Sequence, residues 1–220
     1  MRIIANFHKG EALRFISHLD VQRLVQRAMR RARLPLRYSQ GFNPHPLLAF
    51  ASALSVGHTS DAEWMDVRLE KETSPQVFLE RMNAALPAGM RVLRVMEIEE
   101  TLPALTALIR STNYEVLLKL DAPPDEKKLK ETAAAFMRAS ILVDKKTKSG
   151  VKQVDLQPFV LQLDIIEAAE DVCRLFIKGV LNAAGGLPVD LFIRSLMQYC
   201  ALGGSYRVHR SAVAFDKIEV

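Results

Sequence analysis

The sequence predicts an α+β fold of two tandem ferredoxin-like (βαββαβ) domains with mainly antiparallel sheets. A length of 220 residues, 49% of them hydrophobic, suits one large or two small domains with a real core. Short segments of alternating polarity are interleaved with longer segments whose apolar residues recur at helical spacing. The order of these segments is similar in the two halves of the chain, and it matches the split βαβ arrangement.

The first predicted domain covers residues 1–100 and follows the order strand, helix, strand, strand, helix, strand. We expect these elements at residues 2–7 (continuing at 13–16), 19–33, 46–54, 63–70, 74–85 and 91–98. The first helix carries one apolar stripe, formed by Val21, Leu24, Val25, Ala28, Met29 and Ala32. Pro75 suits the first turn of the second helix, and MDVRLE and RVLRVMEIE alternate as half-buried strands do.

The second predicted domain covers residues 113–220, after a linker at 101–112. Its first strand, TNYEVLLKL, precedes a helix at 123–139 that opens with prolines and acidic residues. The segments SILVDKK and VKQVDLQ predict an additional hairpin around Ser149–Gly150. VLQLDIIEA and VCRLFIKGV extend the sheet, and a helix at 189–200 follows the turn AAGGLP.

The charge is unevenly distributed along the chain, although the net charge is only +5. Residues 1–60 contain nine Lys or Arg and two acidic residues, whereas residues 61–100 contain five basic and nine acidic residues. This distribution indicates a basic face that would meet phosphate or an acidic partner. On the first helix, four arginines lie off the apolar stripe and form either a binding ridge or an ordinary solvated face: Arg23, Arg27, Arg30 and Arg31.

The stretch YSQGFNPHP at residues 38–46 carries more chemistry than a plain connection requires. Two prolines flank His45 and restrict φ on both sides of it, so the polar groups of the loop are held in place. Against RNA, Tyr38 and Phe42 would stack on bases, while Asn43 would read a base edge and His45 would contact phosphate. The alternative is structural, with Tyr38 and Phe42 plugging the sheet.

A second motif, FISHLD at residues 15–20, lies where the first strand leads into the first helix. His18 or the serine before it would cap the helix, and Asp20 suits the positive end of the helix dipole. Capping does not explain the imidazole of His18. If the chain is an enzyme, its candidate acid–base groups are His18, Asp20 and His45. We expect His18, Asn43 and His45 to line one concave site.

The hairpin of the second domain is a further candidate contact for RNA. It carries four lysines: Lys145, Lys146, Lys148 and Lys152. A flexible, positively charged hairpin can follow a phosphate backbone. Lysines at hairpin tips also serve solubility, which is the alternative explanation.

Several classes of site have no support in the sequence. Cys173 and Cys200 are too few for a disulfide framework and are not spaced as a metal pair. The conceivable metal ligands share no short spacing: His18, Asp20, His45 and His58. We therefore expect no metal and no cofactor. No apolar run approaches the roughly 20 residues of a membrane span and no signal peptide is evident, so we expect a cytoplasmic protein.

Taken together, the motifs resemble those of an uncharacterised bacterial family described as radical-SAM-linked. The resemblance rests on FISHLD, the RA-MRRA-LP helix, YSQGFNPHP followed by FA, GVKQVDLQPFV, and G-x-x-S-x-x-E at Gly57, Ser60 and Glu63. In that family a domain of unknown function occurs alone or joined to radical S-adenosylmethionine proteins, some of which bind cobalamin. The resemblance implies a radical SAM protein as a partner. This chain has no C-x-x-x-C-x-x-C motif, so it is not the radical enzyme itself.

Three hypotheses about function follow. The leading one is a non-catalytic RNA-binding or substrate-presenting accessory protein, because ferredoxin-like sheets commonly serve RNA recognition. The second is an RNA-modifying or RNA-processing enzyme that uses the acid–base groups named above. Some pseudouridine synthases share this outline, but their R-T-D signature is missing here. The third is a module that docks on a radical SAM partner through the acidic residues of 61–72.

Overall fold

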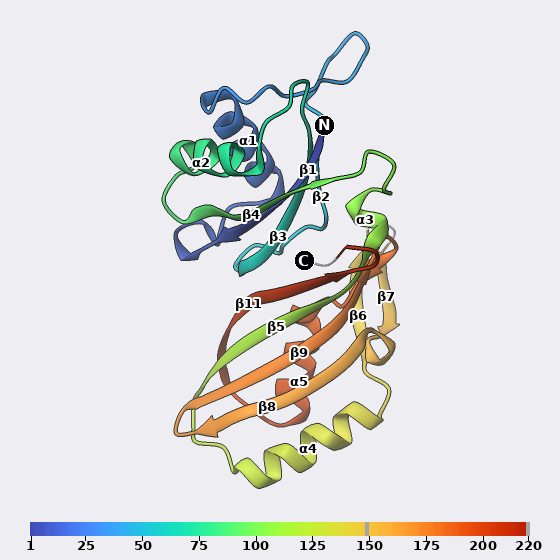
Figure 1. The fold of residues 1–220 in the computed structure, drawn as a ribbon. Helices are drawn as coiled ribbons and strands as arrows, with labels where there is room; N and C mark the ends of the chain where they lie inside the picture. Colours follow the sequence, from blue (N-terminus) through green and yellow to red (C-terminus); the bar gives the residue numbers. More distant parts are fainter. Residues whose placement is uncertain (148–149, 219–220) are drawn as a thin grey trace. The chain divides into compact units, whose positions relative to one another are not determined.

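The structure is a computed structural model that describes residues 1–147 and 150–218 (Figure 1). The chain forms two compact units. Unit 1 comprises Met1–Ile109 together with the segment that begins at His209, and unit 2 comprises Arg110–Val208. The predicted second domain, residues 113–220, runs to the end of the chain, whereas in the structure the C-terminal segment belongs to unit 1.

Unit 1 contains an antiparallel sheet with two long helices on one face (Figure 1). Its elements are β1 (Arg2–Lys9), η1 (Glu11–Leu13), α1 (His18–Arg31), β2 (Leu48–Phe50), β3 (Thr59–Arg68), α2 (Pro75–Ala85), β4 (Met90–Ile98) and α3 (Leu105–Leu108). The strand order is β4-β1-β3-β2, with every neighbouring pair antiparallel. The last strand, β11 (Gly204–Phe215), enters unit 1 at its second half and pairs parallel to β3.

The core of unit 1 lies between this sheet and the two helices. Alternate residues of β1, namely Ile3, Ala5 and Phe7, pack against the apolar stripe of α1. Met29 from α1 and Phe78 from α2 are fully buried in the same cluster. The amphipathic spacing of α1 therefore predicts which face of that helix is buried.

Unit 2 has a sheet of the same general kind with a separate hairpin. Its elements are β5 (Ile109–Leu120), α4 (Glu126–Arg138), β6 (Leu142–Thr147), β7 (Gly150–Asp155), η2 (Gln157–Phe159), β8 (Val160–Ala169), β9 (Val172–Asn182), β10 (Gly185–Gly186), α5 (Val189–Tyr199) and the first half of β11. The neighbours in the sheet run β8, β9, β5, β11, and β6 pairs only with β7. Phe136 of α4 and Phe192 of α5 contact each other in the core.

The α+β class is confirmed, and the sheet is mixed because of the parallel pairing of β11. The tandem ferredoxin-like arrangement stays a prediction. The strand expected to continue at residues 13–16 is wrong, because a short 3-10 helix occupies Glu11–Leu13. The strand expected at 46–54 is reduced to β2. Pro46, at the start of that stretch, lacks the N–H that a ladder needs.

The segment predicted as a linker, residues 101–112, is structured. It contains α3 and the first residues of β5, and Leu105, Leu108 and Ile109 are almost fully buried. Apolar side chains at these positions favour burial over an open connection. Within the described residues, no helix is long and apolar enough to span a membrane.

Candidate nucleic-acid interface

The predicted arginine ridge lies on α1, whose start is fixed by its cap. Ser17 is the N-cap, and its hydroxyl oxygen accepts from the backbone N–H of Asp20 at 3.2 Å. The Ser17 hydroxyl also donates to the Asp20 carboxylate at 2.6 Å, and these bonds are the main reason that the pKa of Asp20 is lowered. Asp20 is therefore engaged in capping, which accounts for it without an acid–base role.

All four arginines of the ridge are exposed, but they are not equivalent. Arg23 forms an ion pair with Asp20 at 3.3 Å, and Arg31 donates to the backbone carbonyl of Ala85 at 2.8 Å. Arg27 and Arg30 form no ion pair or hydrogen bond in the part of the chain that the structure describes. These two guanidinium groups lie on successive turns of α1. They could bind a phosphate backbone without first breaking an ion pair or hydrogen bond within the described part of the protein.

The loop of residues 38–46 extends from unit 1 beyond its sheet (Figure 1). Its base is closed by a bridge between Tyr38 and Pro46. One step further out, the Ser39 N–H donates to the carbonyl of His45 at 2.9 Å. The Ser39 hydroxyl lies 2.9 Å from Nδ1 of His45 and accepts from the His45 N–H at 3.1 Å. The imidazole is thus held in a fixed direction while it stays exposed.

The two aromatic residues of the loop have different environments. Phe42 is fully exposed at the tip, whereas Tyr38 is partly buried and packs against the core of unit 1. Asn43 is exposed beside Phe42. Of the two alternatives, stacking on a base therefore fits Phe42, and the structural role fits Tyr38.

Substitution of the two aromatic residues should separate these roles. Phe42→Ala should change the free energy of unfolding by less than about 0.5 kcal/mol, because the ring touches nothing that folding buries. Tyr38→Ala should cost about 1–3 kcal/mol, because it removes a ring packed on the core. Urea denaturation measures both values. Equal losses of stability would contradict the assignment of Phe42 as a binding residue.

His18 lies on the inner side of α1 rather than at an open site. Its ring packs edge-on against Phe50, with centroids 5.5 Å apart, and contacts Gln22 at 3.1 Å through Nε2. Burial lowers the pKa of His18, with a smaller opposing effect from Glu63. A lowered pKa means that the folded protein favours neutral His18. The contribution of His18 to the free energy of unfolding is therefore fully present above the pKa of the unfolded state, and it is lost as pH falls through the pKa of the folded state.

The structure does not bring His18 and His45 together. His18 lines a small cavity of about 10 Å³ with Lys9 and Glu63, the size of one water molecule. His45 lines a different cavity of about 270 Å³ beside Arg2 and Asp66. The shared concave site expected from the two motifs therefore has no counterpart in this geometry.

Sequence reasoning missed a buried polar cluster beneath α1. Arg210 of β11 is 3% exposed, and its Nη1 lies 3.0 Å from Glu63 Oε1. Lys9, also buried, donates to the carbonyls of Arg14 and His58 at 3.0 and 3.2 Å. Burial lowers the pKa of Lys9, and the negative charge of Glu63 partly offsets this effect.

The pattern G-x-x-S-x-x-E marks one wall of this cluster. Gly57 adopts a φ of 90° and donates its N–H to the carbonyl of Arg14 at 2.8 Å. Ser60 donates its hydroxyl to the carbonyl of Arg210 at 3.1 Å, and Glu63 pairs with the Arg210 side chain. The motif therefore positions buried groups around Arg210.

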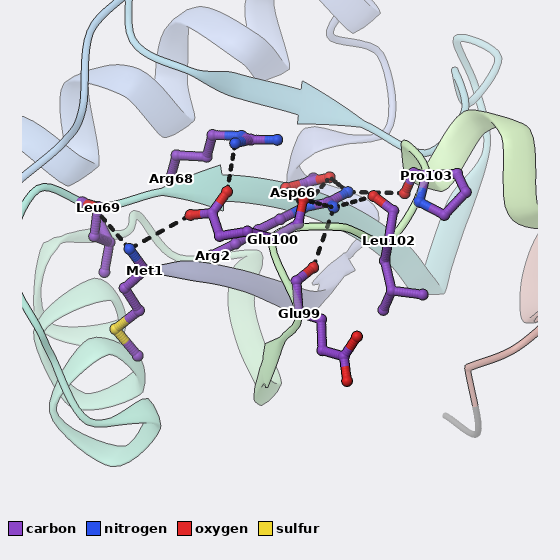
Figure 2. Close-up of polar contacts among 9 residues, drawn as sticks. All are labelled: Met1, Arg2, Asp66, Arg68, Leu69, Glu99, Glu100, Leu102 and Pro103. Carbon is purple, nitrogen blue, oxygen red and sulfur yellow. Dashed lines mark hydrogen bonds and ion pairs between the residues drawn. The ribbon is translucent and has the colours of Figure 1, made fainter.

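A second buried ion pair holds the segment after β4 (Figure 2). Arg2 is 2% exposed and binds the Asp66 carboxylate through Nε and Nη2, with the shortest contact at 2.6 Å. Its remaining N–H groups donate to the carbonyls of Glu99, Glu100, Leu102 and Pro103. The hydrogen bond to Asp66 raises the pKa of Arg2.

These pairs change the reading of the acidic stretch 61–72. Glu63 and Asp66 are buried partners of Arg210 and Arg2, so they present no charge to a docking protein. Glu70 and Glu72 are exposed. Only part of the predicted acidic face therefore remains available to a partner.

The lysine hairpin of unit 2 consists of β6 and β7. Lys145 and Lys152 are register partners, and both are exposed. Lys146 lies in β6, its side chain is not described, and Lys148 lies outside the described residues. The two placed lysines are compatible with contact to phosphate.

No group of three or more His, Cys, Asp or Glu side chains among the described residues is arranged to hold a metal ion. Cys173 is buried, and burial raises the pKa of its thiol to about 11. Burial also raises the pKa of Cys200. Both cysteines therefore favour the unreactive thiol form.

The fold resembles that of longer chains in solved structures of H/ACA and Cbf5 complexes. A chain of "Crystal Structure of a Cbf5-Nop10-Gar1 Complex" matches 96% of this protein with a TM-score of 0.51 and 13% sequence identity. A chain of "Structure of H/ACA RNP bound to a substrate RNA containing 2'-deoxyuridine" matches 94% with a TM-score of 0.50 and 11% identity. A chain of an archaeal box H/ACA sRNP Nop10-Cbf5 complex gives the same values as the latter. The protein spans about half the length of these chains, 46–48%. At this identity the likeness shows the fold alone.

The protein belongs to the family described as "Uncharacterized protein conserved in bacteria (DUF2344)", whose model matches residues 2–186. That description names no radical SAM protein. A search of the curated proteins finds no match.

Proposed function

We propose that this protein is a non-catalytic RNA-binding or substrate-presenting accessory protein and that unit 1 carries its main contact with RNA. The observation that carries the proposal is that unit 1 presents both exposed guanidinium groups without an ion pair among the described residues and an exposed aromatic ring. Arg27 and Arg30 would bind phosphates, and Phe42 at the loop tip would stack on a base. Asn43 and the fixed imidazole of His45 would add polar contacts beside that ring.

The remaining predicted contacts extend this interface. Arg23 would exchange its ion pair with Asp20 for phosphate, and Arg31 would keep its bond to Ala85 while adding positive charge. Tyr38 would support the loop from the core. In unit 2, the hairpin lysines Lys145, Lys146, Lys148 and Lys152 would form a second, weaker contact.

The finer fold assignment belongs to the same proposal. We infer that each unit is ferredoxin-like, because the order β4-β1-β3-β2 in unit 1 is that of a split βαβ arrangement. The order β11, β5, β9, β8 in unit 2 is equivalent once the hairpin β6–β7 is treated as an insertion. Sheets of this type recur in RNA recognition, and similar folds occur in the H/ACA complexes named above.

The enzymatic alternative has less support. Its candidate groups, His18, Asp20 and His45, divide among a buried cavity, a helix cap and an exposed loop. General acid–base catalysis requires such groups within reach of one reacting atom. The hypothesis of a radical SAM partner rests on the motif resemblance alone.

The proposal predicts salt-dependent binding of single-stranded RNA. Fluorescence anisotropy with a labelled oligonucleotide of mixed sequence should show an affinity that falls as salt rises, since each neutralised phosphate releases counterions. Three or four contacts correspond to a slope of about −2 to −3 in log K against log salt. An affinity that does not change with salt would contradict binding through the arginine ridge.

A further inference from the structure

Four polar side chains form a row across the sheet of unit 1, on the face opposite α1 and α2. His8 of β1 is the register partner of Arg91 of β4, so the two side chains lie next to each other on one face. On the other side of His8 lies Asp61 of β3, and His209 of β11 follows it. The neighbouring residues Phe7 and Lys9 are buried on the helix side, which places His8 on the opposite face.

Asp61 contacts both histidines of this row. Nδ1 of His8 lies 2.5 Å from Oδ1 of Asp61, and Nε2 of His209 lies 3.3 Å from Oδ2 of the same carboxylate. The hydroxyl of Thr59 lies 2.9 Å from Nδ1 of His209. Because an ionised carboxylate only accepts, the hydrogen bond between His8 and Asp61 is donated by His8 Nδ1. This bond fixes the orientation of His8 and leaves its Nε2 for another group.

The row borders a cavity of about 470 Å³ that His8 and Arg91 line together. The other residues that line it carry no charge, and the amide of Asn83 is occupied by both polar groups of Val92, at 2.8 and 3.0 Å. Arg91 is exposed and forms no ion pair within the described ranges. Gly10 makes room for the imidazole, since a Cβ at that position would lie 2.5 Å from Nε2 of His8.

We propose that this cavity is a phosphate-binding site in which protonated His8 and Arg91 are the donors. An imidazolium donates from both ring nitrogens, so Nε2 of protonated His8 would donate to the anion while Nδ1 keeps its bond to Asp61. Arg91 supplies the planar donor group that matches phosphate oxygens. Among the described residues no carboxylate lines the cavity, because Asp61 lies on the far side of His8, so its two charged or titratable residues favour an anion over a metal ion. The inference does not rest on RNA binding by α1.

The test uses inorganic phosphate and the ring resonances of His8, assigned with a His8→Gln variant. At about pH 6, phosphate should shift the His8 signals, and chloride at equal ionic strength should not. Arg91→Gln should weaken binding about tenfold at pH 6, while Arg81→Gln, an exposed arginine of α2, should leave it unchanged.

A second arm identifies the source of the phosphate. If single-stranded RNA displaces inorganic phosphate from His8, the site takes the backbone phosphate of RNA. If RNA leaves the His8 signals unchanged while phosphate binds, the site takes a small phosphate ester. That result would be independent of RNA binding by α1. No response of His8 to phosphate at pH 6, or an Arg91→Gln variant that binds like the native chain, would overturn the proposal.

Discussion

Replacing Arg210 with Met should destabilise unit 1 by about 3–5 kcal/mol, because it leaves the Glu63 carboxylate buried without its main partner. The guanidinium also donates to the hydroxyl oxygen of Ser52 at 2.9 Å and to the carbonyl of Ala53 at 3.1 Å, so the substitution removes three interactions. The free energy of unfolding, measured by urea denaturation, reports the loss directly.

A double variant separates the cost of the lone charge from the cost of lost packing. In Arg210→Met with Glu63→Gln, the buried charge is gone, so stability should recover by about 1–2 kcal/mol relative to the single variant. Recovery should be partial, because Lys9 also loses the negative charge that offsets its burial. A single variant within 1 kcal/mol of the native chain would show that the pair is not buried as described.

Replacing Arg2 with Met should have a similar effect, about 3–5 kcal/mol, through the second buried pair. Asp66 would lose its partner, and the carbonyls of residues 99–103 would lose the donors that hold that segment (Figure 2). We therefore also expect faster amide hydrogen exchange in this segment, since its anchoring contacts are gone.

The matched control is Arg68→Met, on the strand that carries Asp66. Arg68 pairs with Glu100, but both side chains are more than one-third exposed. An exposed ion pair contributes at most about 1 kcal/mol, so this variant should stay close to the native stability. If Arg2→Met and Arg68→Met cost the same, burial does not govern these two pairs.

The sequence predicted the local features of unit 1 better than its long-range contacts. Helical periodicity located α1 and α2 within two residues at their ends, and the off-stripe arginines are exposed as expected. The partner of Glu63 could not be found in this way, because Arg210 lies 147 positions away on a strand that returns to unit 1. Alternation along a strand shows that a residue is buried but not which distant residue it meets.

The arrangement of the two motifs also depends on long-range contacts that the sequence does not show. Residues 38–46 and 15–20 both suggested functional side chains, and their closeness along the chain suggested one site. In the structure His45 and His18 instead line different cavities, and the ring of His18 packs against Phe50. His8, Asp61 and His209 carried no motif at all, because their association depends on the order of strands in the sheet.

The measurement that tests RNA binding by α1 most directly is the salt slope of an Arg27→Gln, Arg30→Gln variant. Loss of two phosphate contacts should make log K against log salt shallower by about 1.4 on single-stranded RNA, with the affinity at low salt reduced as well. The control, Lys127→Gln with Lys128→Gln on α4, removes the same charge from exposed positions of unit 2 and should keep the native slope. A slope unchanged in the arginine variant, or equally reduced in both, would contradict binding through this ridge.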